Sequence, residues 1–301
     1  MKKKHKKLIA SIIIVLIVML YNIHQEQIKP SNANITNIVT NELKVYFFDV
    51  GQADSILISN NDTNMLIDAG NNEDGELLTE YIKKDLNIRK IDIVIGTHPH
   101  EDHIGGLDDI INNFEVETLY LPEVISLSKT FEDVIDAIEE NNLSISVPET
   151  NEEFKLGEAE FKILYTGKDE KDLNNSSIVL KMTYGNHNYL FTGDATEKVE
   201  KTILNKNIKA DVLKVGHHGS SYSSSQEFLN KVQPKYAIIS CAKKNSYNHP
   251  SEETLYRLNK INAKVYNTMD LGTIILTSDG ENININNKKQ IRMDRWIWNI
   301  V

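Results

Sequence analysis

The chain has 301 residues, enough for one large domain or two small ones. Its formal net charge is −10, which excludes a protein that binds nucleic acid through an overall basic surface. A polyanionic substrate would need positive charge from bound metals and from a local basic patch. The single cysteine, Cys241, excludes an intrachain disulfide and a cysteine-rich zinc ribbon.

The N-terminus carries a cluster of lysines, followed by the nearly unbroken apolar run 8–21. A basic stretch before an apolar segment is typical of a membrane leader, and the lysines place its start in the cytoplasm. The run is short for a spanning helix of about 20 residues, but extension to Ile23 brings it close. We therefore expect 1–23 to be an uncleaved signal anchor, with a cleaved signal peptide as the alternative. Either one places the rest of the chain outside the cell membrane, anchored or secreted.

A polar linker is expected over 24–42, a folded domain over 43–290 and a C-terminal tail over 291–301. The first half of the domain begins with strands and continues with strand–helix alternation. Strands are expected at 44–50, 55–59, 64–68, 91–95 and 117–121, and helices at 75–86, 107–114 and 127–141. Two of these strands end in an acid, Asp49 and Asp68. These acids either cap turns or hold metal-binding histidines from behind.

The second half repeats this pattern of strands followed by alternation. Strands are expected at 153–156, 160–165, 177–184, 189–192, 211–215 and 235–240 and near 264, 273 and 283, with helices at 196–204, 224–232 and 252–259. Two similar halves of this kind predict an α/β fold in which two sheets lie face to face with helices outside, a four-layer αββα sandwich.

The loop 97–106, Thr-His-Pro-His-Glu-Asp-His-Ile-Gly-Gly, follows the apolar strand 91–95. Its imidazoles and carboxylates are the ligands that a divalent metal such as zinc takes in proteins. His98 and His100 alternate along extended backbone and therefore project to the same side. Asp102 and His103 follow the turn and can bind a second metal. A solvated polar loop is the alternative, but three of the nine histidines within six residues disfavour it.

A second polar group follows two later strands. Asp194 comes after the apolar strand 189–192 and Gly193, an arrangement that also suits a helix N-cap. His217 and His218 come at the end of the next strand. Since the ends of neighbouring strands meet at one edge of a sheet, we expect these side chains to face the 97–106 loop.

These segments together resemble the metallo-β-lactamase-fold hydrolases. Within that family they are most similar to the hydrolase domain of the ComEC-type competence proteins and their stand-alone relatives. The matching segments run in the family's order through most of the domain: 49–55, 66–70, 97–106, 192–194, 217–220 and 245–250. The resemblance is specific for fold and metal chemistry and does not identify the substrate.

The resemblance implies two divalent metal ions, with Zn²⁺ expected and Mn²⁺ as the alternative. His98 and His100 would bind one metal, Asp102 and His103 would bind the other, and Asp194 would bridge the two. A water shared by two such metals becomes a hydroxide near neutral pH.

One of His217 and His218 would complete the second site, while the other would contact the substrate or the leaving group; the sequence leaves this choice open. Asp102 and His218 are the candidate catalytic residues, with Asp102 placed to hold or deprotonate the attacking water. Ser220 and His249 are expected to line the site.

One departure from the family pattern concerns the first metal. Many members carry a further ligand histidine between the loop that corresponds to 97–106, here called the metal loop, and the bridging aspartate. In this chain residues 174–177 are Asn-Asn-Ser-Ser. His187 lies nearby, in an expected hairpin turn, and is the alternative ligand. Occupancy of the first site is therefore open.

We expect an extracytoplasmic hydrolase that cleaves phosphodiester or related ester bonds with a metal-bound hydroxide. Single-stranded DNA is the substrate suggested by the ComEC-type relatives, and a cell-wall polymer is suggested by the phosphorylcholine esterases. A monomer is expected. The alternative from another class is a metal-stabilised binding module without turnover.

Overall fold

The computed structural model describes residues 42–169 and 171–288. The expected anchor at 1–23, nearly all of the linker at 24–42 and the tail at 291–301 lie outside the described residues. Within the described ranges, no helix is both long enough and apolar enough to cross a membrane.

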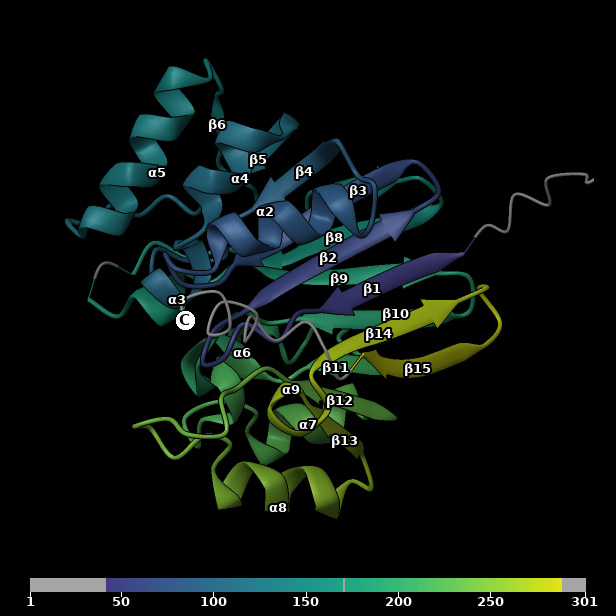
Figure 1. Ribbon diagram of the computed structural model, residues 1–301. Helices are drawn as coiled ribbons and strands as arrows, with labels where there is room; N and C mark the ends of the chain where they lie inside the picture. Colours follow the sequence, from purple (N-terminus) through teal and green to yellow (C-terminus); the bar gives the residue numbers. More distant parts are fainter. Residues whose placement is uncertain (1–41, 170, 289–301) are drawn as a thin grey trace, which may run out of the picture. The chain divides into compact units, whose positions relative to one another are not determined.

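Fifteen strands form two sheets in the described part of the chain (Figure 1). The first sheet has the order β15-β14-β1-β2-β3-β4-β5-β6. Its strands are β1 (Leu43–Phe47), β2 (Ser55–Asn60), β3 (Thr63–Ala69), β4 (Lys90–Ile95), β5 (Glu115–Tyr120), β6 (Ile145–Ser146), β14 (Thr273–Ser278) and β15 (Ile283–Lys288).

The second sheet has the order β13-β12-β11-β10-β9-β8-β7. Its strands are β7 (Glu153–Leu156), β8 (Ala159–Tyr165), β9 (Val179–Tyr184), β10 (His187–Phe191), β11 (Val212–Lys214), β12 (Tyr236–Ile239) and β13 (Lys264–Asn267). Each sheet combines an antiparallel part with a parallel part. The parallel strands are β3–β6 in the first sheet and β10–β13 in the second.

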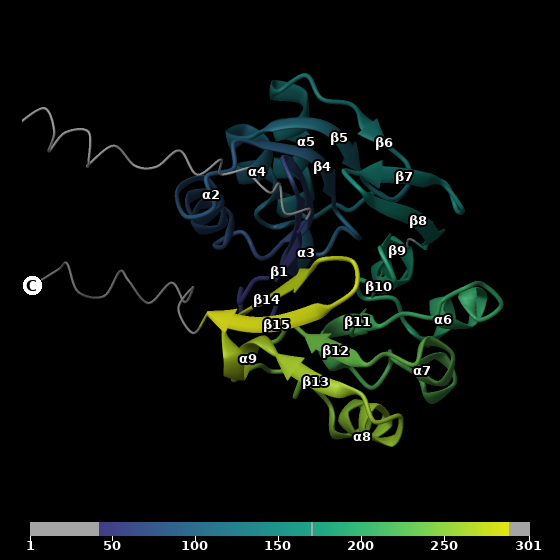
Figure 2. The ribbon, with the colours of Figure 1, turned by 90° about the vertical axis from the view of Figure 1, so that its right-hand side faces the viewer.

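Helices flank both sheets, on opposite sides of the domain (Figures 1 and 2). Apolar faces of α2 (Gly75–Lys84), α4 (Leu107–Asn113) and α5 (Lys129–Glu140) pack on the first sheet. Those of α6 (Glu197–Ile203), α7 (Gln226–Val232) and α8 (Glu252–Lys260) pack on the second. Short helices α3 (Glu101–Ile104) and α9 (Thr268–Leu271) and turns η1 (Leu173–Ser176) and η2 (Gly216–Gly219) complete the elements. The expected two-sheet α/β architecture is confirmed.

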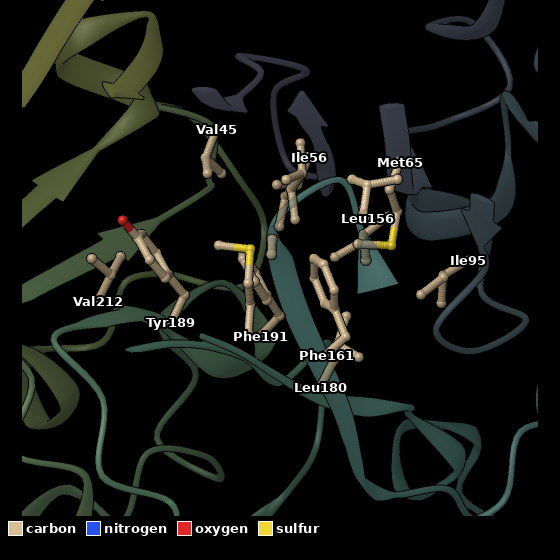
Figure 3. Packing of buried hydrophobic residues seen from close by; sticks show 14 of the residues in the cluster. Val45, Ile56, Met65, Ile95, Leu156, Phe161, Leu180, Tyr189, Phe191 and Val212 are labelled. Carbon is tan, nitrogen blue, oxygen red and sulfur yellow. The ribbon is translucent and has the colours of Figure 1, made fainter. Parts of the chain in front are cut away.

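The core between the two sheets follows from the two-residue period of the strands. In β1, Val45 and Phe47 face the second sheet, whereas Tyr46 faces the helix side. Figure 3 shows the side chains of both sheets pointing toward one another, with Phe161 and Phe191 among them. Burial of these large apolar side chains is the main force that holds the sheets together.

The C-terminal hairpin takes a place that the sequence pattern did not indicate. β14 follows the second half of the chain, yet it pairs antiparallel with β1, with Leu43 opposite Ser278. The first sheet thereby gains a partner for the edge of β1 that β2 leaves open. An unpaired strand edge exposes N–H and C=O groups, so this return covers a weak point of the first sheet.

Several helices and strands begin at other residues than the sequence predicts. In two cases a serine side chain near the element's start accepts a hydrogen bond from a backbone amide. Helix α5 begins at Lys129 because Ser128 is its N-cap and accepts a hydrogen bond from the Phe131 amide. Strand β9 begins at Val179, whereas Ser177 uses its hydroxyl to accept from the Asp194 amide at 3.1 Å. His187 is the first residue of β10 and not part of the hairpin turn.

Replacement of Phe161 with alanine tests the packing between the sheets. Phe161 is 2 % exposed and stacks on Phe154 with ring centroids 5.2 Å apart. We expect a loss of about 3–5 kcal/mol in the free energy of unfolding, measured by urea denaturation. Tyr256→Ala, at a side chain that is 67 % exposed, is the control and should change stability by less than about 0.5 kcal/mol. Equal stabilities of the two variants would contradict this assignment of the core.

Candidate metal centre

The loops after the parallel strands of both sheets meet at one place. His98 and His100 follow β4, and Asp194 follows β10. The Ile178 amide, before β9, donates to the Thr97 carbonyl at 3.0 Å and joins the two sheets here. The metal-loop residues of the first half therefore lie against Asp194 of the second half, as the sequence predicts.

Gly105 allows the metal loop to pack tightly against the chain that follows β3. Its amide donates to the Gly70 carbonyl at 2.9 Å. A Cβ atom at Gly105 would lie 2.2 Å from the Asn72 backbone nitrogen. Only glycine fits at this contact, which holds α3, with the side chains of Asp102 and His103, at the centre.

His98 and His100 present their ring nitrogens to each other. The His98 side chain is fully buried, and its Nε2 lies 3.1 Å from Nδ1 of His100. The Thr97 hydroxyl donates to Asp68 at 2.8 Å, so it accepts from Nδ1 of His98 at 3.1 Å. Nε2 of His98 is then left without a proton. Burial, together with the nearby His103, holds the pKa of His98 well below its usual value.

His103 is oriented by Asp68, as one of the two sequence hypotheses for Asp68 requires. Nδ1 of His103 lies 2.8 Å from Oδ2 of Asp68, which also accepts from Thr97. Nδ1 therefore carries a hydrogen, and Nε2 is left free to bind a cation. Nε2 lies 3.2 Å from Oδ1 of Asp194, and both atoms are buried without a hydrogen-bond partner among the described residues.

Two acceptors that face each other in this way require a cation. Burial would lower the pKa of His103, but Asp194 and Asp68 outweigh it and raise that pKa well above its usual value. In the ion-free protein, a proton on the imidazole therefore supplies the positive charge. A metal ion at the same position would displace this proton, as metal binding to histidine generally does. The donor set thus fits a divalent metal.

His218 repeats the arrangement of His103. Its Nδ1 lies 3.0 Å from the Ser240 carbonyl and 3.4 Å from Oδ1 of Asp54, both of which are acceptors. Nε2 faces Oδ2 of Asp102 at 3.2 Å and Oδ2 of Asp194 at 3.7 Å. Burial would lower the pKa of His218, but Asp194 and Asp54 raise it to about 10. Here too, an Nε2 nitrogen and two carboxylates converge on the position of a cation.

One cluster therefore contains four candidate metal ligands, which come from both halves of the chain. A ligand atom from each of Asp102, His103, Asp194 and His218 lies within 4.8 Å of the other three. Oδ2 of Asp194 also lies 4.0 Å from Nε2 of His98, so this carboxylate stands between the other three residues of the cluster and the pair His98 and His100. Burial would raise the pKa of Asp194, but the imidazoles of His103 and His218 hold it well below its usual value.

His217 and His218 separate into different environments. His218 is buried within the cluster, whereas the His217 side chain is 22 % exposed with Nε2 3.6 Å from Oδ2 of Asp194. Both residues adopt positive φ angles, 51° and 52°. Such left-handed backbone costs about 1–2 kcal/mol per residue and is found at functional sites. The kink turns two adjacent imidazoles toward the same carboxylate from different directions.

Asp54 and Lys214 form a buried ion pair that sequence reasoning missed. Nζ of Lys214 lies 2.7 Å from Oδ2 of Asp54, and both side chains are 1 % exposed. The other carboxylate oxygen of Asp54 faces His218. The available signal was Lys214 itself, a charged residue that ends the short apolar strand β11 and lies close to the two histidines. The pair holds the carboxylate that orients His218.

Ser177 is the second residue that sequence reasoning missed. It lies in the stretch 174–177, where many family members are expected to carry a further histidine. Its hydroxyl accepts from the Asp194 amide and lies 3.4 Å from Nδ1 of His98. Ser177 thus supports both residues. His187 lies at the opposite end of β10 from Asp194, with Nδ1 3.8 Å from Oδ2 of Asp211, so the alternative of His187 as a ligand is wrong.

The remaining candidates, Asp49, Ser220 and His249, have different surroundings in the structure. The Asp49 amide donates to the Thr273 hydroxyl at 3.0 Å and ties the loop after β1 to β14. Ser220 is buried, and its hydroxyl accepts from the Tyr222 amide at 3.3 Å, a contact within the turn. The ring of His249 lies beside that of His217, with centroids 5.5 Å apart. Burial, together with His217, lowers the pKa of His249 to about 4.

Lys214→Met tests whether the buried ion pair supports the centre. Loss of the ammonium leaves the carboxylate of Asp54 buried without its counter-ion, and we expect a loss of about 3–5 kcal/mol in unfolding free energy. The double variant Lys214→Met with Asp54→Asn removes the uncompensated charge and keeps an acceptor for His218. It should recover most of the lost stability in urea denaturation. A double variant no more stable than the single one would show that the pair is not the cause.

Sequence comparison relates this chain to known proteins. Residues 48–243 match the family model of the metallo-β-lactamase superfamily. ComE operon protein 3 of Bacillus subtilis is 32 % identical over 256 residues, covering 78 % of this chain and 33 % of that protein. Competence protein ComA of Neisseria gonorrhoeae is 27 % identical, covering 76 % of this chain and 31 % of that protein. The chain thus spans about a third of the length of these curated relatives.

Comparison with solved structures agrees at the level of the fold. The metallo-β-lactamase fold protein YhfI of Bacillus subtilis superposes with a TM-score of 0.55 at 12 % identity, covering 78 % of this chain and 100 % of that one. At this identity the likeness concerns the fold alone. The match of the family model to most of the domain is the stronger finding, and by it this chain belongs to the metallo-β-lactamase superfamily.

Proposed function

We propose that this protein is a metal-dependent hydrolase of phosphodiester or related ester bonds. The observation that carries the proposal is the convergence of His103, His218 and two carboxylates on one position, with both imidazoles presenting Nε2. The atoms at this position are acceptors unless an imidazole takes up a proton. Such a set is costly to bury and gains its stability when a divalent cation binds.

The geometry suggests how two ions would be held. His98, His100 and Asp194 would bind one ion, and Asp102, His103 and His218 would bind the other, with Asp194 shared. Imidazole and carboxylate ligands suit Zn²⁺, and Mn²⁺ is the alternative. Bound ions of this kind lower the pKa of a water molecule and neutralise charge on a phosphoryl or carbonyl oxygen.

Of the two roles expected for Asp102, holding an attacking water is better supported than deprotonating it. Its side chain is 32 % exposed, so it lies at the open side of the cluster. Burial would raise the pKa of Asp102, but His103 and His218 outweigh this and lower it to about 2. The group is therefore an ionised acceptor at neutral pH that can hold an attacking water by a hydrogen bond, whereas so low a pKa makes it a weak general base. His218 holds the carboxylate in place and is itself fixed by Ser240 and Asp54.

The location and the substrate class belong to the same proposal. The lysine-rich, apolar residues 1–23 support an anchor or a signal peptide, with the catalytic domain outside the membrane. One relative, of Neisseria gonorrhoeae, is named a competence protein and another, of Haemophilus influenzae, a recombination protein, and these names support a nucleic-acid substrate over a cell-wall ester. We propose that the domain acts as a monomer. A binding module without turnover is the competing hypothesis.

Loss of metal ligands tests the enzyme hypothesis. His98→Ala and Asp194→Ala should each lower turnover of bis-p-nitrophenyl phosphate by at least about a hundredfold, since even residues that only support a ligand cost ten- to a hundredfold. Metal content is measured in parallel by mass spectrometry, and a chelator should abolish wild-type turnover. His187→Ala is the matched control and should behave as wild type. A metal-loaded wild-type protein that is inert would favour the binding module.

Single replacements distinguish the roles of the two adjacent histidines. His218→Ala removes a member of the buried cluster, so bound metal should fall to about half of the wild-type amount. His217→Ala removes an imidazole at the open side, so metal content should stay close to that of the wild type while turnover falls. The reverse pattern of metal loss would assign the ligand role to His217.

A further inference from the structure

The loop 242–250, between β12 and α8, borders the metal centre and differs in charge from the rest of the protein. It carries Lys243 and Lys244, both exposed, and residues 241–251 contain no acidic residue. The chain as a whole has a net charge of −10. Glu252 and Glu253 follow at the start of α8, and Glu253 pairs with Arg257. The positive charge that a polyanion would meet here is therefore that of the two loop lysines.

The loop is held in one conformation by its own hydrogen bonds. The Asn245 side-chain amide donates to the carbonyls of Ala242 at 3.0 Å and His249 at 2.7 Å. Its carbonyl oxygen accepts from the amides of Tyr247 at 3.1 Å and His249 at 3.0 Å. Gln52 accepts from the Ala242 amide at 3.2 Å and thereby ties the loop to the first half of the chain. The loop is thus built before any ligand arrives.

A line of aromatic rings connects the tip of the loop with the metal centre. Tyr247 is 66 % exposed and stacks on His249, with centroids 5.7 Å apart and an interplanar angle of 26°. His249 meets the ring of His217 edge-on at 5.5 Å. Nε2 of His217 lies 3.6 Å from Asp194. One face of the Tyr247 ring is therefore supported, and two ring contacts connect it with the imidazole beside Asp194.

An exposed tyrosine alone means little, since Tyr222 and Tyr256 are 75 % and 67 % exposed. The ring contacts from Tyr247 to the metal centre, together with the adjacent lysines, single it out. A choline group could also be attracted to an aromatic face, but the two ammonium groups would repel its positive charge. A chain of phosphates and aromatic bases satisfies both features.

We propose that the loop 242–250 positions a single-stranded nucleic acid at the metal centre. Tyr247 stacks on a base, and Lys243 and Lys244 contact backbone phosphates, so that a neighbouring phosphodiester lies at the centre. Tyr247 is in these terms a substrate-positioning residue. The inference rests on the proposed phosphodiesterase function and assigns the residues that position the substrate.

The test measures binding separately from turnover. The probe is a short fluorescein-labelled oligothymidylate with a hydrolysis-resistant phosphorothioate backbone, titrated with the full chain and followed by fluorescence anisotropy. Tyr247→Ala should weaken binding roughly tenfold, because it removes one stacking contact. Tyr247→Phe keeps the ring and should restore the affinity. Tyr256→Ala, which removes an equally exposed tyrosine from α8, should bind as the wild type does.

The lysines are tested through the dependence of binding on salt. The double variant Lys243→Ala with Lys244→Ala should lower the salt slope of log affinity by about 1.4, since each phosphate contact on a single strand contributes about 0.7. The double variant Lys231→Ala with Lys260→Ala removes the same charge from α7 and α8 and should leave the slope unchanged. Equal slopes for the two double variants would overturn the role of the loop lysines.

The failures of the two proposals are distinguishable. A wild type that turns over bis-p-nitrophenyl phosphate but does not bind the oligothymidylate overturns the inference and leaves the enzyme hypothesis standing. The same holds if Tyr247→Ala binds as tightly as the wild type, or if Tyr256→Ala loses as much affinity. A metal-loaded wild type that does not turn over bis-p-nitrophenyl phosphate but binds the oligothymidylate through Tyr247 overturns the hydrolase and supports the loop as a nucleic-acid site.

Discussion

The buried carboxylate of Asp194 is the feature on which the rest of the centre depends. A carboxylate at 2 % exposure is tolerated only where positive charge surrounds it. Here the charge comes from imidazoles contributed by both sheets, His103 from the first and His218 from the second. The two halves of the sandwich must therefore meet in one register for Asp194 to be stable. Metal binding would reinforce that register, because the same atoms would hold the ions.

A layer of supporting groups lies behind the ring nitrogens and determines which of them face the centre. Asp68 holds His103, while Asp54 and the Ser240 carbonyl hold His218. Lys214 in turn balances Asp54 at 1 % exposure, which is an expensive arrangement unless its geometry serves a purpose. That purpose is the orientation of imidazoles, and it explains why charged groups are buried inside a sandwich whose core is otherwise apolar.

At the surface near the centre, the charge of the loop 242–250 differs from that of the protein as a whole. The protein is acidic overall, so the approach of a polyanion must be favoured locally or not at all. The loop 242–250 combines two lysines with an exposed aromatic ring beside His249, and Asn245 keeps this loop in shape. In the function we propose, metal chemistry and substrate positioning would be carried by adjacent but separate groups of side chains, a division that lets one fold serve many substrates.

The amino-acid sequence by itself determined the strand and helix pattern, the two-sheet α/β class, and the two polar segments around His98–His103 and Asp194. These features are local, because apolar periodicity and loop composition are written in neighbouring residues. Only the tertiary structure placed the hairpin β14–β15 beside β1, because strand pairing depends on which edge remains free. It also decided that His218 joins the buried cluster and His217 its open side, since this depends on left-handed backbone angles at both residues. The ion pair of Asp54 with Lys214 could not be predicted from the sequence either, since its two members lie far apart in the chain and meet only when the sheets pack.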